Sequence, residues 1–257
     1  MSETVQSAPR RDKNFWSANY LNEGAITMAR LENHPPLNNP KILVNVGSHL
    51  AAEARPYIDA GWRVFAFEPN PVLHDQLREM ERAHENFTFL PKAVSDKPGE
   101  DLTFWVSDKS SGMSSLVKRD PDAREVKVEV TTLAAFCEEY GIEAIDFLLV
   151  DAELKDLEVV MSLGPSTRVG ALCVEFGGNR LNALHGTITE RWPQFDEIIW
   201  EYRKPLGEDG KEKMGVAAKC IARSSYEQYI EKVRTDAPRG RWGNIFYFDR
   251  RFVKKGR

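Results

Sequence analysis

Two short segments of the chain carry residues suited to binding a nucleoside. Gly47, in VNVGSHL, follows an apolar run, and a glycine at a strand-to-helix turn lets the backbone approach a ligand closely. Glu68, in FEPNP, lies 21 positions later, at the expected tip of the next strand. A carboxylate about 20 positions after such a turn accepts hydrogen bonds from ribose hydroxyls. The chain lacks a full G-x-G-x-x-G, which disfavours a dinucleotide and favours an adenosine ligand without phosphates.

A third segment, KAVSD, follows the third expected strand. Its position is where the next loop would meet an adenine, and Asp96 could accept a hydrogen bond from the exocyclic amine. The residues that follow are rich in turn formers, so an ordinary turn is also compatible with this segment.

Carboxylates cluster in a fourth segment, LLVDAELKDLE. Asp151 comes directly after an apolar strand, and Glu153 shares its loop. Ligands of open α/β sheets bind outside the carboxyl ends of the strands, so both side chains are expected to face the ligand. Either could orient a cationic group or act as a general base. Asp156 and Glu158 are expected at solvated positions near a helix N-terminus.

A fifth segment, CVEFGGN, places Glu175 near the end of another strand, where it could face a substrate or pair with an arginine or a backbone amide. Convergence of Asp151, Glu153 and Glu175 would suit a metal, but no zinc-type spacing occurs and magnesium sites leave no reliable mark in a sequence. We therefore expect no metal.

The elements that must position these residues alternate between strands and helices. Strands are expected at 42–46, 63–67, 87–90, 102–106, 126–130, 145–150, 171–176, 195–202 and 244–248, and helices at 51–60, 71–83, 133–140, 155–163 and 226–233. This alternation predicts an α/β fold with a doubly wound, mainly parallel sheet. The last two strands lack a full crossover between them, which favours an antiparallel final strand.

The amino-acid composition limits the classes of protein to which the chain could belong. With 257 residues, 42% of them hydrophobic, the chain resembles an ordinary soluble enzyme, and its net charge of −4 gives no global field for nucleic acid. Cys137, Cys173 and Cys220 lack any pairing pattern, which indicates free thiols in a reducing compartment. No signal peptide or membrane helix is evident, so we expect a cytoplasmic protein that binds no membrane.

In this order, the five segments resemble the FkbM family of class I methyltransferases, over roughly residues 41–176. The resemblance rests on the glycine loop, FEPNP, AVSD, a Ser-Ser-Leu segment, Asp-x-Glu and a strand that ends in Val-Glu. It implies a Rossmann-like fold and S-adenosyl-L-methionine as the cofactor. Members mostly methylate hydroxyl groups of sugars and natural products.

Site residues follow from the matched positions. The cofactor is expected to contact Asn45, Gly47, Ser48, His49, Glu68, Pro69, Ala93, Val94, Asp96 and Asp151. Ser114, Ser115 and Glu175 are expected near the substrate, in part because the serine-rich loop at 107–116 is flexible by composition. Asp151 or Glu153 is expected to remove the proton of the acceptor. His185 is a further candidate, because it lies ten residues after Glu175, in the region that would cap the substrate.

Five positions depart from the family pattern. In the first loop, Asn45 replaces the usual aspartate, Ala51 replaces the second glycine, and His49 stands where asparagine is common. In the fourth segment, Leu149 replaces a lysine and Leu154 replaces the glycine after the acid. A neutral Asn45 would weaken the contact with the cofactor's ammonium group, so a descendant without catalysis is an alternative.

The sequence thus predicts an O-methyltransferase of small molecules, with residues 1–40 as a helical extension that could cover the site and residues 41–257 as the catalytic domain. The sequence is compatible with a homo-oligomer, and no nucleic acid is expected as a partner. The alternatives are a cofactor-binding protein without catalysis, an RNA-modifying methyltransferase and a nicotinamide-dependent oxidoreductase. The basic tail RRFVKKGR is the main support for the RNA alternative.

Overall fold

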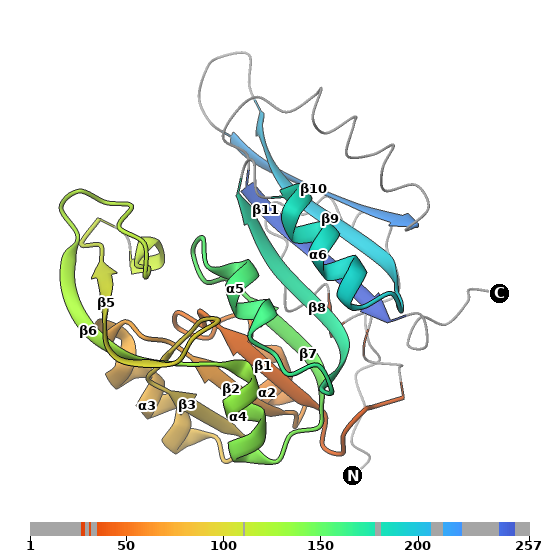
Figure 1. The fold of residues 1–257 in the computed structure, drawn as a ribbon, viewed down its shortest axis with the longest axis horizontal. Helices are drawn as coiled ribbons and strands as arrows, with labels where there is room; N and C mark the ends of the chain where they lie inside the picture. Colours follow the sequence, from red (N-terminus) through yellow and green to blue (C-terminus); the bar gives the residue numbers. More distant parts are fainter. Residues whose placement is uncertain are drawn as a thin grey trace, which may run out of the picture.

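A computed structural model describes residues 27–28, 31, 35–109, 111–177, 181–206, 213–222 and 242–249. Its main feature is an eight-stranded sheet in the order β10-β9-β11-β8-β7-β1-β2-β3 (Figure 1). The strands are β1 (Ile42–Val46), β2 (Arg63–Phe67), β3 (Phe87–Leu90), β7 (Ala144–Val150), β8 (Arg168–Gly177), β9 (Phe195–Leu206), β10 (Lys213–Ala222) and β11 (Trp242–Asp249). The helices are α2 (Arg55–Asp59), α3 (His74–Ala83), α4 (Leu133–Tyr140), α5 (Asp156–Met161) and α6 (Leu181–Arg191).

The pairing of the strands confirms the predicted fold class. Five strands, β3, β2, β1, β7 and β8, run parallel to one another in the sheet. Strand β11 runs antiparallel to both β8 and β9. The expected strands at 195–202 and 244–248 do pair with each other. The edge position belongs instead to β10, which the sequence did not suggest.

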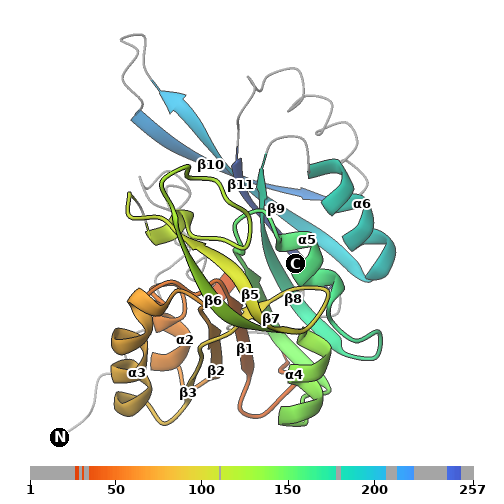
Figure 2. The same ribbon diagram turned by 60° about the vertical axis from the view of Figure 1, so that its left-hand side comes forward.

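Both faces of the sheet are covered, as a doubly wound fold requires. One core contains apolar residues of α4, α5 and α6, and the other contains residues of α2 and α3 together with Leu31 (Figure 2). All five residues of β1 are buried, because neighbours in the strand point alternately into the two cores. The central strands are therefore fixed by packing on both sides.

Several expected elements differ from the observed ones. The helix expected at 51–60 is reduced to α2, because His49 and Ala51 adopt positive φ and the chain turns irregularly before it becomes helical. Helix α6 was not expected, since its sequence has Gly186 at its centre and a weak apolar pattern. The expected helix at 226–233, and the N-terminal aromatic residues Trp16 and Tyr20, lie outside the described residues.

A second, three-stranded sheet is formed by β4 (Ala93–Val94), β5 (Gly99–Val106) and β6 (Arg124–Thr131). The strands expected at 102–106 and 126–130 are present as β5 and β6, and they pair antiparallel to form a ribbon. We call residues 107–123, which join the two strands, the flap. In Figure 1 the ribbon and the flap rise above the α3 side of the large sheet.

Residues 35–40 are tied to the centre of the sheet. The buried carboxylate of Asp146 in β7 accepts hydrogen bonds from the backbone N–H of Leu37 at 2.6 Å, the side chain of Asn38 at 2.8 Å and the backbone N–H of Ile42 at 2.9 Å. This part of the N-terminal segment belongs to the same unit as β1. Among the described residues, no helix is long and apolar enough to cross a membrane.

Candidate functional site

A cleft opens at the carboxyl ends of β1, β2 and β7, the edge where ligands of open α/β sheets bind. Loops that follow these strands form one wall, and the flap and β4 form the other. The lining residues are Val46, Gly47, His49, Phe67, Glu68, Pro69, Lys92, Ala93, Val94, Phe104, Ser111, Gly112, Ser114, Leu116, Asp151, Ala152, Glu153 and Lys155.

Gly47 joins two of these loops. Its φ of +75° favours glycine, and a Cβ at this position would lie 1.7 Å from the backbone oxygen of Asp151. The N–H groups of Gly47 and Ser48 donate to the carbonyl of Phe67 at 3.0 and 2.9 Å. Because glycine has no side chain here, the backbones of the loops after β1, β2 and β7 can contact one another directly.

Glu68 lies at the end of β2 and is only 6% exposed. One carboxylate oxygen accepts a hydrogen bond from the N–H of His49 and the other from the N–H of Asn70, both at 2.8 Å. Burial raises the pKa of Glu68 to about 7, and these two amide bonds oppose the shift. Each oxygen keeps a lone pair that can accept from a hydroxyl donor in the cleft.

The loop after β7 has an unusual backbone. Glu153 and Leu154 both have positive φ, of 49° and 81°. The side chain of Asp156 holds the turn by accepting from the N–H of Ala152 at 2.8 Å. Asp156 is 7% exposed, so the prediction of a solvated helix position was wrong: its carboxylate is turned inward, toward the amides of its own loop. Burial raises the pKa of Asp156 to about 6 against those amide hydrogen bonds.

Three carboxylates meet beside this loop. Oxygen atoms of Asp151, Asp156 and Glu175 lie within 4.8 Å of one another. Asp151 is exposed to the open cleft, yet protein surrounds its carboxylate on the other sides, and burial followed by the charge of Asp156 raises its pKa. Burial and the charge of Asp151 raise the pKa of Glu175 further. Glu175 therefore keeps a proton and donates it in a hydrogen bond to Asp151.

Carboxylate oxygens in such a group are the ligands that Mg²⁺ and Ca²⁺ prefer. The carboxylates that converge are those of Asp151, Asp156 and Glu175, whereas the sequence had suggested Glu153 as the third member in place of Asp156. Glu153 points instead toward the flap, where its carboxylate forms an ion pair with Arg119.

Hydrogen bonds link the flap to each wall loop. His49 shares a hydrogen bond of 2.7 Å with the hydroxyl of Ser111, and the side-chain amide of Asn70 donates to the hydroxyl of Ser114 at 3.3 Å. Ser115 is buried and donates its hydroxyl proton to the carbonyl of Glu153 at 2.6 Å. The flap is thus closed against the loops after β1, β2 and β7.

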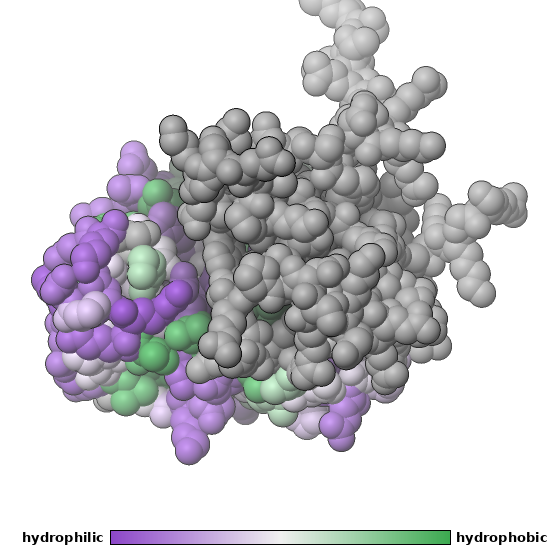
Figure 3. Space-filling model, turned by 90° about the horizontal axis from the view of Figure 1, so that it is seen from above, coloured by the Kyte–Doolittle hydropathy of each residue, from purple (hydrophilic) through white to green (hydrophobic). Residues whose placement is uncertain are grey.

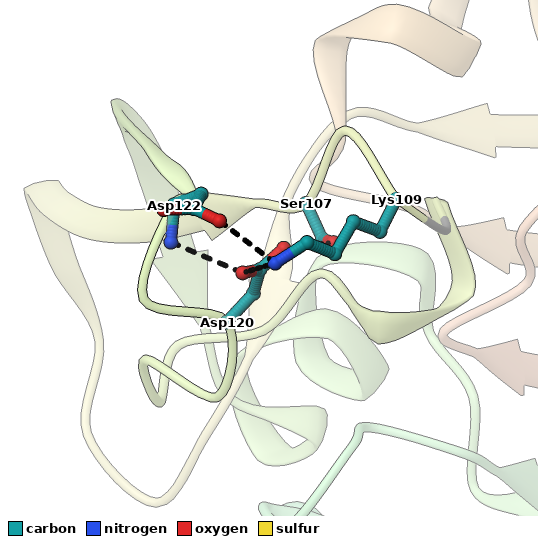
Figure 4. Close-up of polar contacts among 4 residues, drawn as sticks. All are labelled: Ser107, Lys109, Asp120 and Asp122. Atoms are coloured by element: carbon teal, nitrogen blue, oxygen red, sulfur yellow. Dashed lines mark hydrogen bonds and ion pairs between the residues drawn. The ribbon is translucent and has the colours of Figure 1, made fainter.

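The neck of the flap is held by one charged group of residues. Lys109 contacts the carboxylates of Asp120 and Asp122 at 2.8 Å, and Ser107 donates to Asp120 at 2.8 Å (Figure 4). These ionic hydrogen bonds lower the pKa of Asp120 to about 2, chiefly through Lys109. Seen from above, the surface on the flap side of the molecule is mainly hydrophilic (Figure 3).

Nine of the residues expected at the site line the cleft together: Gly47, His49, Glu68, Pro69, Ala93, Val94, Ser114, Asp151 and Glu153. Ser115 lies behind this surface as the anchor of the flap, and Glu175 lies behind Asp151. The sequence missed Asp156, Arg119 and Lys155. Their positions depend on turns whose conformation no sequence pattern announced.

Four other expected residues lie away from the cleft surface. Asn45 is 2% exposed inside β1, and its side-chain nitrogen has no hydrogen-bond partner among the described residues. Ser48 is buried, and Asp96 is exposed and accepts from its neighbour Ser95.

His185 is the fourth. It lies on α6, where its ring stacks on Tyr247 and Nδ1 is 3.0 Å from the tyrosine hydroxyl. Tyr247 pairs with Leu172 in the middle of β8 and belongs to the core beneath α6. The structure therefore does not bring His185 among the residues that line the cleft.

The fold and the cleft define a class. An open parallel sheet with an antiparallel last strand, a glycine turn after β1 and a carboxylate at the end of β2 are features of class I methyltransferases that use S-adenosyl-L-methionine. The methyltransferase FkbM domain model matches residues 42–200. The chain belongs to the FkbM methyltransferase family, and its cofactor is S-adenosyl-L-methionine.

Solved structures resemble the chain more distantly. A precorrin-6y C5,15-methyltransferase from Geobacter metallireducens is 10% identical with a TM-score of 0.40, over 88% of each chain. A SAM-dependent methyltransferase from Agrobacterium tumefaciens is 10% identical with a TM-score of 0.43, over 88% of this chain and 60% of that one. A Streptococcus mutans protein in complex with SAH is 9% identical with a TM-score of 0.41, over 77% of this chain and 96% of that one. No curated protein sequence matches the chain.

Proposed function

We propose that this methyltransferase transfers the methyl group to a hydroxyl of a small molecule, such as a sugar or a natural product, with Asp151 as the general base. The observation that carries the proposal is the environment of Asp151. Asp151 is exposed and lines the cleft, its carboxylate lies within 4.8 Å of those of Asp156 and Glu175, and its pKa is raised. A general base works best when its pKa lies near the working pH.

The cofactor fits the residues of the cleft. Glu68 has free lone pairs for the two ribose hydroxyls, and Ala93, Val94 and Phe104 offer apolar surface for the adenine. The carboxylates of the loop after β7 suit a cationic ligand. When bound, S-adenosyl-L-methionine supplies an electrophilic methyl group on a positively charged sulfur.

The chain's own residues would then do two things. The wall loops and the flap orient the acceptor so that its oxygen lies in line with the methyl carbon, and such positioning is worth several orders of magnitude in rate. Asp151 would take the hydroxyl proton of the acceptor, which would make the acceptor oxygen the nucleophile that methyl transfer needs. Asp151 would then return this proton to solvent.

Asp151 is preferred over the two other candidate bases. Glu153 is engaged in an ion pair with Arg119, which directs its carboxylate to the flap. His185 is engaged with Tyr247. The net charge of −4 disfavours binding to RNA and so supports a small-molecule acceptor, and the proposal also includes a cytoplasmic location.

The test combines binding with turnover. Calorimetric titration with S-adenosylhomocysteine should give saturable micromolar binding, and NADH should give none. With an acceptor found by screening sugars and polyketides, Asp151→Asn should lower kcat by about 10²–10⁴-fold, the usual contribution of a general base. Glu138→Gln, on the exposed face of α4, removes a carboxylate elsewhere and should leave kcat unchanged.

The outcomes separate the alternatives. Full activity of Asp151→Asn would remove this residue from the mechanism. Binding without methylation of any acceptor would favour a protein that has kept the cofactor site and lost catalysis. Absence of binding would mean that the departures at Asn45 and Leu154 mark a lost cofactor site.

A further inference from the structure

Four of the five residues in the turn after β7, residues 151–155, line the cleft. The conformation of this turn therefore shapes the site in which S-adenosyl-L-methionine binds. We propose that Ser115 is a positioning residue that fixes the backbone of the turn and so keeps the cleft in its binding shape. The inference rests on the proposed function because it concerns the same cleft, but it holds whichever residue acts as the base.

The backbone of the turn is unfavourable by itself. Glu153 and Leu154 have left-handed φ angles of 49° and 81°, which residues with a Cβ rarely adopt. Local hydrogen bonds help at one point: the N–H of Ala152 donates to the side chain of Asp156 at 2.8 Å, and its carbonyl accepts from the N–H of Lys155 at 3.3 Å. Neither bond involves the carbonyl of Glu153, so this group needs a partner from another part of the chain.

Ser115 supplies that partner. Its hydroxyl donates to the carbonyl of Glu153 at 2.6 Å and accepts from the N–H of Val117 at 3.1 Å. A hydroxyl has one proton and a carbonyl can only accept, so the direction of the first bond is fixed. Because Ser115 is only 2% exposed, water competes little for this bond.

The serine is itself held in a defined place. Its backbone exchanges two hydrogen bonds with Trp105 of β5, at 3.0 Å from its own N–H and at 2.8 Å from the N–H of Trp105. A donor fixed in this way can determine where its acceptor lies. The ion pair of Arg119 with Glu153 cannot replace it, because that pair holds the side chain of Glu153 and not its backbone.

Loss of the hydroxyl should let the turn relax away from its left-handed angles. The cleft would then have its binding shape for a smaller fraction of the time, and the apparent dissociation constant of a ligand rises as that fraction falls. The net contribution of one hydrogen bond corresponds to a change of about 2–10-fold in such an equilibrium.

The first measurement is hydrogen exchange of the whole protein without ligand, followed at the amides of Ala152 and Lys155. Their protection, taken relative to that of the amides in the middle of β7, should fall by about 2–10-fold in Ser115→Ala. The comparison with β7 separates local opening of the turn from unfolding of the whole domain.

Ser162→Ala is the matched control. Ser162 is also a buried serine, and its hydroxyl donates to the carbonyl of Val159 at 2.6 Å and accepts from the N–H of Leu133 at 3.0 Å. It follows the last residue of α5 and does not line the cleft. The same kind of contact is therefore lost away from the turn, and the relative protection of the turn amides should not change.

The second measurement is calorimetric titration with S-adenosylhomocysteine. The dissociation constant should rise by about 2–10-fold in Ser115→Ala and stay unchanged in Ser162→Ala. Ser115→Thr keeps the hydroxyl and should restore the affinity. Leu154→Gly, added to Ser115→Ala, should restore part of it, because glycine adopts the left-handed angle without penalty.

A purely structural role of Ser115 would lower thermal stability in Ser115→Ala and Ser162→Ala alike, with the affinity of both unchanged. That result would overturn the inference, as would unchanged protection of the turn amides in Ser115→Ala. If Ser115→Ala does not fold, Ser115→Cys provides the test, because its thiol is a weaker donor and should give the same changes at smaller size.

Failure of this inference is distinguishable from failure of the proposed function. Full turnover in Asp151→Asn would reject the base and leave both measurements on Ser115 as they are. Loss of turnover in Asp151→Asn, with unchanged affinity in Ser115→Ala, would keep the base and reject the positioning role. Absence of S-adenosylhomocysteine binding to the native protein would reject the cofactor cleft and the positioning role together.

Discussion

The two walls of the cleft are built by different means. Loops after β1, β2 and β7 are joined by backbone hydrogen bonds, such as those from Gly47 and Ser48 to Phe67, beside strands that are buried on both faces. The flap is joined by side-chain hydrogen bonds and ion pairs, and its Lys109 is 61% exposed. Contacts between side chains, such as the exposed pair of Lys109 with Asp122, open at lower free energy than a packed core. We therefore expect the flap to open more readily than the wall formed by the loops after β1, β2 and β7.

Gly47→Ala tests the wall formed by the loops after β1, β2 and β7 and should have the largest effect. The left-handed φ costs a non-glycine residue about 1–2 kcal/mol, and the contact with the backbone of Asp151 adds an overpacking cost of about 1–3 kcal/mol. We expect the free energy of unfolding to fall by about 2–5 kcal/mol in urea denaturation, with loss of cofactor binding.

Gly61→Ala is the matched control, because its φ is +76° and nothing lies within 4 Å of the added Cβ. Its free energy of unfolding should fall only by the cost of the left-handed φ, about 1–2 kcal/mol. If the free energy of unfolding fell equally in Gly47→Ala and Gly61→Ala, the close approach of the loops at Gly47 would add no steric cost.

Leu154→Gly tests the same wall with a smaller effect and the opposite sign. Leu154 has a φ of 81°, so glycine should relieve about 1–2 kcal/mol of backbone strain, less the entropy that glycine gains on unfolding. We expect a net gain of about 0.5–1 kcal/mol in denaturation experiments. Ala152→Gly, in the same loop without positive φ, should destabilise, and a loss in both variants would show that this turn is unstrained.

Lys109→Met tests the flap and should have a smaller global effect than Gly47→Ala. The ion pair with Asp122 is exposed on both sides and contributes little, whereas Asp120 is buried but keeps its hydrogen bonds from Ser107 and from the N–H of Asp122. The denaturation midpoint should therefore fall only a little. Hydrogen exchange within residues 107–123 should nevertheless become faster, because the neck loses its contacts with Asp120 and Asp122. Lys127→Met removes an exposed lysine from β6 and serves as the control. Unchanged exchange in Lys109→Met would mean that the wall loops alone hold the flap.

The sequence predicted best those site residues whose positions are determined by the buried strands and by the points where these strands end. Gly47, Glu68 and Asp151 follow apolar strands directly, so the parallel sheet alone brings them to one edge. Asp156 was missed because a carboxylate at a helix N-terminus usually faces water, and its burial depends on the positive φ of Glu153 and Leu154. Glu153 also contacts Ser115 and Arg119 of the flap, which are distant in the sequence.

Residues of the flap and of α6 were harder to place. The position of Arg119 depends on an ion pair between segments 34 residues apart, and no local pattern reports such a contact. His185 was expected near the substrate from its distance in sequence to Glu175. The helix that carries it packs on the middle of the sheet, so its ring meets Tyr247.

The place of β11 in the sheet has a consequence for synthesis on the ribosome. It is translated after β9 and β10, yet it lies between β8 and β9 and pairs with both. Until β11 emerges, the β9–β10 hairpin has no strand partner in the sheet, and the edge of β8 presents unpaired backbone groups that favour aggregation. A nascent chain stalled before β11 should therefore need chaperone protection, and one stalled beyond it should not.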